Sequence, residues 1–159
     1  MDHDLRAGEL SVMAPPATDA GLVFIGRIGT PWTERTACPR QGGLDGPLCT
    51  IDVFEPWIAA LEGIAQYPTL EILYWMNQAR RDLVRQNPAN DQRTRGTFAL
   101  RSPLRPNPIA SSIVAVERLE GGRLFVRGLD CLDGTPLLDI KPDRQCFTPP
   151  KVGDAICQS

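Results

Sequence analysis

Short β-prone runs that do not alternate with helices are the feature that most constrains the fold of this chain. Each run is rich in β-branched, Leu or aromatic residues and is bounded by turn-forming residues such as Gly, Pro and Asp. One helical pattern, over residues 55–64, interrupts the series. Strands without alternating helices favour an antiparallel sheet or a small barrel. The predicted strands are residues 21–29, 49–54, 69–76, 96–101, 111–119, 123–130 and 136–142.

Glycine-rich nucleotide-binding loops of the common kinds are absent from the sequence. No G-x-G-x-x-G follows a predicted strand, and no G-x-x-x-x-G-K-[ST] occurs anywhere. Doubly wound dinucleotide folds and P-loop folds are therefore disfavoured. We predict a mainly β fold, a small antiparallel β-barrel with one or more short helices, and not a Rossmann fold.

The chain has 159 residues, which is the size of one globular domain. We expect an irregular N-terminal arm over residues 1–20, a barrel domain over 21–145 and a C-terminal tail over 146–159. The first twenty residues lack the basic and apolar regions of a secretory signal, and no apolar run approaches the length of a membrane span. These features predict a cytoplasmic protein that does not enter membranes.

The charged residues are unevenly distributed. The net charge is −2, but residues 80–105 contain seven arginines and two aspartates. Arginine forms bidentate contacts with phosphate and stacks on bases, so this segment is a candidate contact for a polyanion. A general preference for arginine over lysine throughout the chain is the alternative explanation.

Cysteine and histidine are too sparse for most metal-dependent or nucleophilic chemistry. The five cysteines include no C-x-x-C pair, and His3 is the single histidine. This pattern supports neither a zinc site nor a disulfide framework. It also excludes Ser-His and Cys-His triads. We therefore expect free thiols and no metal.

Four polar segments lie at the ends of predicted strands, where side chains can surround a ligand. Prolines stiffen residues 101–108, which suits the wall of a site, although a rigid connector or a Pro-x-x-Pro docking peptide has the same composition. The aspartates of residues 129–142 suit ribose hydroxyls, a cation or a metal, or they cap turns. The four segments are residues 38–43, 76–80, 101–108 and 129–142.

Four motifs in a fixed order point to a known family. They read IGRIGTPW, CPRQGG, GTFALRSPLRPNPIASS and LDCLDGTPLLDIKP, and they span residues 22–142. The set resembles the YaeB/TsaA-like family, also called the TrmO family. The resemblance implies a small TsaA-like β-barrel that binds S-adenosylmethionine and forms homodimers with sites at the subunit interface. It also implies N6-methylation of threonylcarbamoyladenosine on the 3′ side of the tRNA anticodon.

The resemblance further implies roles for individual residues. Asp139 matches the motif, and because the reaction requires removal of a proton from nitrogen, we predict Asp139 as the proton acceptor; its alternative role is a structural anchor for Lys141. The predicted substrate-binding residues are Arg105, Asn107, Asp133 and Lys141. The predicted cofactor-binding residues are Arg40, Gln41, Asn77, Gln78, Arg101, Ser111, Leu129, Asp130 and Leu132.

Three positions depart from the family pattern. Ala110 follows RPNPI where glycine is usual, Asn77 stands where histidine is frequent, and Asp143 replaces an aromatic residue after DIKP. Longer family members also carry a C-terminal domain. Two alternatives to tRNA methylation stay open: methylation of another RNA or of a small molecule, and binding of S-adenosylmethionine by a non-catalytic sensor or interaction module.

Overall fold

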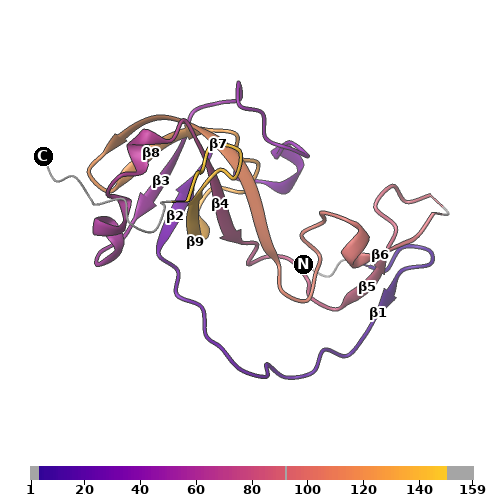
Figure 1. Cartoon of the computed structure of the whole chain (residues 1–159). Helices are drawn as coiled ribbons and strands as arrows, with labels where there is room; N and C mark the ends of the chain where they lie inside the picture. The colour runs from indigo at the N-terminus through magenta and orange to yellow at the C-terminus, as the bar shows by residue number, and fades with distance from the viewer. Residues whose placement is uncertain (1–3, 92, 150–159) are drawn as a thin grey trace, which may run out of the picture.

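The computed structural model describes residues 4–91 and 93–149 and contains two β-sheets (Figure 1). The larger sheet closes into a six-stranded barrel in the order β2-β3-β8-β7-β4-β9, and its neighbouring strands are antiparallel. This arrangement confirms the predicted small antiparallel barrel. Its strands are β2 (Gly26–Gly29), β3 (Cys49–Val53), β4 (Thr69–Trp75), β7 (Ile109–Glu120), β8 (Arg123–Arg127) and β9 (Thr135–Pro142).

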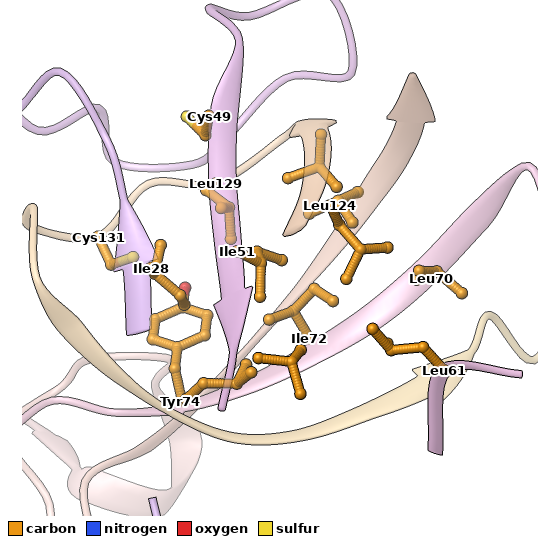
Figure 2. Packing of buried hydrophobic residues seen from close by; sticks show 14 residues of the cluster. Ile28, Cys49, Ile51, Leu61, Leu70, Ile72, Tyr74, Leu124, Leu129 and Cys131 are labelled. Atoms are coloured by element: carbon orange, nitrogen blue, oxygen red, sulfur yellow. The ribbon is translucent and has the colours of Figure 1, made fainter. Parts of the chain in front are cut away.

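Alternate residues of the barrel strands fill its interior. In β4, Leu70, Ile72 and Tyr74 are at most 2% exposed, whereas the residues between them are half-buried on the outer face. A period of two is expected for a strand with one face in an apolar core. Figure 2 shows these side chains meeting Ile28, Ile51 and other apolar residues of the same cluster. Burial of this apolar surface is the main force that closes the barrel.

A second sheet of three short strands lies beside the barrel (Figure 1). We call it the small sheet; it comprises β1 (Leu10–Ser11), β5 (Leu83–Gln86) and β6 (Arg95–Gly96) in the order β1-β5-β6. Residues 12–25, which contain no helix or strand, connect β1 to the barrel in a long exposed path. The N-terminal segment therefore pairs with chain that lies more than seventy residues further on.

The predicted strand over residues 96–101 is wrong. Residues Arg95–Gly96 form β6, and the chain then turns through the 3₁₀ helix η4, Thr97–Ala99. The buried Thr97 hydroxyl donates to the Leu83 carbonyl (2.7 Å) and accepts from Gln86 Nε2 (2.9 Å). These side-chain bonds compete with further strand pairing, as threonine near a turn commonly does.

The predicted helix over residues 55–64 is also wrong in type. Two 3₁₀ helices stand in its place, η2 (Trp57–Leu61) and η3 (Ile64–Gln66). Gly63 separates them with φ of +80°, a left-handed conformation that ends a helix and that glycine adopts without strain. A further short 3₁₀ helix, η1, covers Arg35–Ala37.

The described residues cover part of the predicted N-terminal arm, barrel domain and C-terminal tail. Leu10–Ser11 form β1 within the arm that was expected to be irregular. The boundaries of the arm, barrel domain and tail stay predictions. His3, Cys157 and the last ten residues of the predicted tail lie outside the described residues. In the described part of the chain, no helix is long and apolar enough to cross a membrane.

Candidate functional site

The loop that contains CPRQGG packs against the segment that contains LDCL at one end of the barrel. The Gly42 amide donates to Asp130 Oδ2 at 3.3 Å. A Cβ atom on Gly42 would collide with the Gly128 carbonyl oxygen, so this close approach requires glycine. The structure thus brings the two segments together through Gly42; one carries the predicted cofactor residues Arg40 and Gln41, and the other carries Leu129, Asp130 and Leu132. The Leu129 side chain is 1% exposed and faces the barrel core.

A buried tyrosine contacts the same aspartate from inside the barrel. Tyr74 is 2% exposed and its hydroxyl donates to Asp130 Oδ1 at 2.6 Å. Ser112 Oγ lies 2.7 Å from the Tyr74 hydroxyl and 3.4 Å from Asp130 Oδ1. Burial, followed by the charge of Asp130, raises the pKa of Tyr74 above its ordinary value, so this hydroxyl stays protonated well into the alkaline range. We call Gly42, Tyr74, Ser112 and Asp130 the Tyr74 cluster.

Tyr74 and Ser112 are the residues of this cluster that sequence reasoning missed. The available signal was strand parity, because Leu70, Ile72 and Tyr74 form the apolar face of one predicted strand. Tyr74 stands at the end of this face, where a tyrosine commonly places its hydroxyl against a polar group. Figure 2 shows its ring among the core residues, with the hydroxyl toward the side where Cys131 lies.

Asn77 and Gln78 follow β4 three and four residues after Tyr74, and both are exposed. The Met76 amide donates to the Pro108 carbonyl at 2.9 Å, which joins this end of β4 to the proline-rich segment.

Arg81 links the same two segments through its side chain. It stacks on Trp75, and its guanidinium donates to the Asn107 side chain at 3.1 Å. The predicted residues Asn77, Gln78 and Asn107 therefore belong to the end of β4 that carries Tyr74.

Arg101 and Ser111 lie together on the outer face of the barrel. Arg101 Nη2 is 3.4 Å from the Ser111 carbonyl oxygen. The Ser111 hydroxyl donates to Glu71 Oε1 at 2.6 Å, on the outer side of β4. Ser111 therefore points away from the interior that its neighbour Ser112 faces.

Arg105 and Asp133 each form hydrogen bonds with backbone groups of nearby loops. Arg105 Nη1 donates to the Leu100 and Ser102 carbonyls at 2.8 and 3.1 Å, so its guanidinium folds back on its own loop. Asp133 Oδ1 accepts from the Thr30 amide at 3.1 Å, which ties LDGTP to IGTPW. In the structure, these two side chains stabilise the loops that border the site.

Asp139 and Lys141 stand on the outer face of β9, beside a cleft of about 480 Å³. Lys141 Nζ is 2.5 Å from Asp139 Oδ2, and this hydrogen bond is the main cause that raises the pKa of Lys141. Asp139 Oδ1 accepts the Ile140 amide at 2.9 Å. The two predicted residues are thus mutual partners. The residues that line the cleft are Glu71, Leu73, Lys141, Pro142, Arg144 and Phe147.

The predicted residues therefore fall into adjoining groups and not into one enclosed pocket. One group surrounds the Tyr74 cluster at the end of the barrel, and the other lies on the outer face of β4, β7 and β9. The groups adjoin because Ser111 and Ser112 are successive residues of β7. Within the described residues, no three His, Cys, Asp or Glu side chains gather as metal ligands.

The chain is similar to proteins that share most of this barrel. Residues 27–147 match the family model described as the tRNA-methyltransferase O N-terminal domain. The chain is 55% identical over 145 residues to the probable S-adenosyl-L-methionine-binding protein VirR of Rhizobium radiobacter, covering 91% of this chain and 83% of VirR. An S-adenosyl-L-methionine-binding protein of Archaeoglobus fulgidus is 38% identical over 125 residues, which are 77% of this chain and 90% of that protein.

A solved structure has the same fold. The crystal structure of TrmO from Pseudomonas aeruginosa matches with a TM-score of 0.66 and 34% sequence identity, over 89% of this chain. The match covers 61% of the TrmO chain. The chain therefore spans about three fifths of the length of this structural relative.

Proposed function

The chain belongs to the tRNA-methyltransferase O (TrmO) family, and from this premise we propose that it is an S-adenosylmethionine-dependent methyltransferase. The proposed acceptor is N6 of threonylcarbamoyladenosine next to the tRNA anticodon. The observation that carries the proposal is the meeting of CPRQGG, LDCL and the end of β4 around Asp130. These three segments hold seven of the nine residues that the family resemblance assigns to the cofactor.

The chemical groups around Asp130 fit S-adenosylmethionine. A carboxylate suits ribose hydroxyls or the amino group of the methionyl part, and arginine suits its carboxylate. Arg40 and Gln41 are exposed and directly precede Gly42, which contacts Asp130. Leu132 is half-buried and supplies apolar surface, whereas the Leu129 side chain is 1% exposed and belongs to the barrel core. The close approach of Gly42 to Gly128 supports a fixed geometry for the two loops. The remaining cofactor candidates, Arg101 and Ser111, adjoin this group along β7.

When bound, S-adenosylmethionine supplies an electrophilic methyl group for in-line displacement. The chain's own residues orient the acceptor nitrogen, exclude water and accept the proton that nitrogen loses. We propose Asp139 as the acceptor of this proton and Lys141 as the residue that holds its carboxylate. The cleft beside this pair supports the assignment, because an adenosine needs a concave surface next to the base.

The arginines of residues 80–105 are the proposed contacts for tRNA phosphates. Arg85, Arg93 and Arg95 are exposed around the small sheet. A phosphate contact releases counterions, so replacing these three arginines with glutamine is expected to weaken tRNA binding and to reduce its salt dependence by roughly one unit of slope per contact. Replacement of the exposed Arg27 on β2 is the control, since it lies outside the arginine-rich segment.

Two measurements on the purified chain test the proposal. Titration calorimetry with S-adenosylmethionine and with S-adenosylhomocysteine measures cofactor binding. Incubation with threonylcarbamoylated tRNA and the cofactor, followed by nucleoside mass spectrometry, detects the methylated product. Absence of cofactor binding by the folded chain would overturn the proposal. The Asp139→Asn variant tests the proton acceptor: normal activity with normal cofactor affinity would remove Asp139 from the mechanism.

A second candidate function is cofactor binding with a different acceptor or with none. Two observations favour it: VirR and the Archaeoglobus relative are named as binding proteins, and the chain spans about three fifths of the TrmO structure. Binding of the cofactor without modification of the tRNA would support this candidate. We also propose the homodimer that the family implies, for which light scattering after gel filtration is the test.

A further inference from the structure

The Tyr74 hydroxyl reaches the proposed cofactor site from inside the barrel. Its proton points at Asp130 Oδ1 across 2.6 Å, while Asp130 Oδ2 accepts the Gly42 amide at 3.3 Å. One carboxylate thus bridges the barrel core and the CPRQGG loop. Without its bond to Tyr74, Asp130 has fewer contacts that fix its direction at this half-buried position.

The hydrogen bond from Tyr74 to Asp130 is strong because its acceptor is charged and its donor is held rigidly. A hydrogen bond to an ionised group is shorter and stronger than one between neutral groups, and 2.6 Å is within the range for O–H···O⁻. The donor is rigid because its ring is 2% exposed and packs within the barrel core. Ser112 Oγ contacts the same hydroxyl at 2.7 Å and limits its rotation.

We propose that Tyr74 is a positioning residue of the cofactor site, which acts by fixing the Asp130 carboxylate and, through it, the CPRQGG loop. The inference rests on the proposed cofactor site. Tyr74 itself is buried and is not assigned a contact with the cofactor or the acceptor. Its effect passes through Asp130, and a phenylalanine would keep the packing of the ring and lose this effect.

The chain provides a matched control for the substitution. Its second tyrosine, Tyr67, is half-buried, and its ring centre lies 6.4 Å from that of Phe147. Among the described residues, its hydroxyl has no hydrogen-bond partner. Tyr67→Phe therefore removes the same atom as Tyr74→Phe without removing a bond to the site.

Amide exchange tests the positioning role without the cofactor. The Gly42 amide reports the bond to Asp130 directly, and Tyr74→Phe is expected to speed its exchange about tenfold. Tyr67→Phe is expected to leave it unchanged. Equal exchange at Gly42 in Tyr74→Phe and the unmodified chain would overturn the inference. This exchange measurement does not require the cofactor. It therefore tests the role of Tyr74 even if the chain does not bind S-adenosylmethionine and the proposed function fails.

A double-mutant cycle tests whether Tyr74 acts through Asp130. Tyr74→Phe is expected to raise the Kd for S-adenosylmethionine about tenfold in the unmodified chain and less than twofold in the Asp130→Asn background. An equal effect in both backgrounds would show that Tyr74 acts by another route and would contradict the proposal. Thermal melting identifies a variant that fails to fold. In that case Ser112→Ala takes its place, because it removes the other hydrogen-bond partner of the Tyr74 hydroxyl and leaves the Tyr74 ring and the Gly42 bond to Asp130 intact. Unchanged exchange at Gly42 in this variant would contradict the positioning role.

Discussion

The barrel and the small sheet differ in how polar their buried side chains are. The barrel encloses apolar side chains such as Leu70, Ile72 and Val114, all 0% exposed, and its closed sheet has paired strands all round. The small sheet has strands of two to four residues; beside the apolar Leu83, its buried side chains are polar, namely Gln86 and the adjoining Asn87 and Thr97. The first is stabilised mainly by apolar burial and the second by specific hydrogen bonds.

This difference predicts how each region responds to change. Apolar burial is non-directional and extensive, so the barrel should unfold as one cooperative unit. A small set of directional bonds can break locally while the rest of the molecule stays folded. The barrel is therefore suited to hold the proposed cofactor loops, whereas the small sheet can open locally.

The largest expected effect is on the barrel core. Ile72→Ala removes a fully buried side chain and leaves a cavity, which is expected to lower the free energy of unfolding by about 2–5 kcal/mol. Urea denaturation followed by circular dichroism measures this change. A loss confined to a few amides, with the global transition unmoved, would contradict the description of the barrel as one cooperative unit.

A smaller, local effect is expected for the small sheet. Thr97→Val removes the hydroxyl that bonds Leu83 and Gln86, at a local cost of about 1–3 kcal/mol. Amide exchange should rise in β5 and β6, while the urea midpoint of the barrel stays the same. A shift of the global midpoint equal to the local loss would show that the two regions unfold together.

Alkaline pH should act on the barrel. Burial raises the pKa of the Cys131 thiol from 9.0 to about 12, so the folded chain holds this proton more tightly than the unfolded chain. The resulting stability is full below pH 9 and is lost as pH rises toward 12, by about 1 kcal/mol at pH 10. Urea denaturation at pH 8 and pH 10 measures it. Cys131→Ala should show a weaker dependence, and an unchanged one would refute the assignment.

Acid pH should act on the small sheet, with the smallest effect. The bond from Arg80 is the main cause that lowers the pKa of Asp82 below 3.8. Since the folded pKa is depressed, the stability is present above pH 3.8 and is lost as pH falls further, by at most about 1 kcal/mol. Amide exchange in β5 at pH 5 and pH 3, corrected for intrinsic rates, measures it. Asp82→Asn should remove the difference.

The barrel could be predicted from the sequence because its strands carry their own pattern. Apolar residues alternate through TLEILYW and fall on one face. The small sheet carries no such pattern. Its strand β1 has two residues. The small sheet is also held by side-chain bonds from Gln86 to the Leu104 carbonyl and from Thr97 to the Leu83 carbonyl, and such polar residues resemble loop sequence. Short strands of this kind are recognisable only once their partners are known.

In the candidate site, too, the sequence predicts one part and only the folded structure reveals the other. The motifs identified the loops, but strand register decides which side chain of each loop or strand turns inward. Ser111 was predicted and lies outside, whereas its neighbour Ser112 lies inside against Tyr74. Tyr74 and Asp130 are 56 positions apart, so their contact depends on closure of the barrel and leaves no local signal. The sequence predicts Arg105 as a substrate-binding residue, but in the structure its Nη1 donates to the nearby Leu100 and Ser102 carbonyls.

The long connection over residues 12–25 tethers the N-terminal segment to the small sheet that it binds. Arg6 Nη1 donates to the Asn87 and Pro88 carbonyls, Glu9 Oε1 accepts the Asn87 amide, and β1 adds its pairing with β5. A tether of this length keeps the segment at a high effective concentration near β5. One cut in the exposed connection would turn this contact into a bimolecular one. At low protein concentration the freed peptide would leave, and β5 would present an open strand edge to other chains.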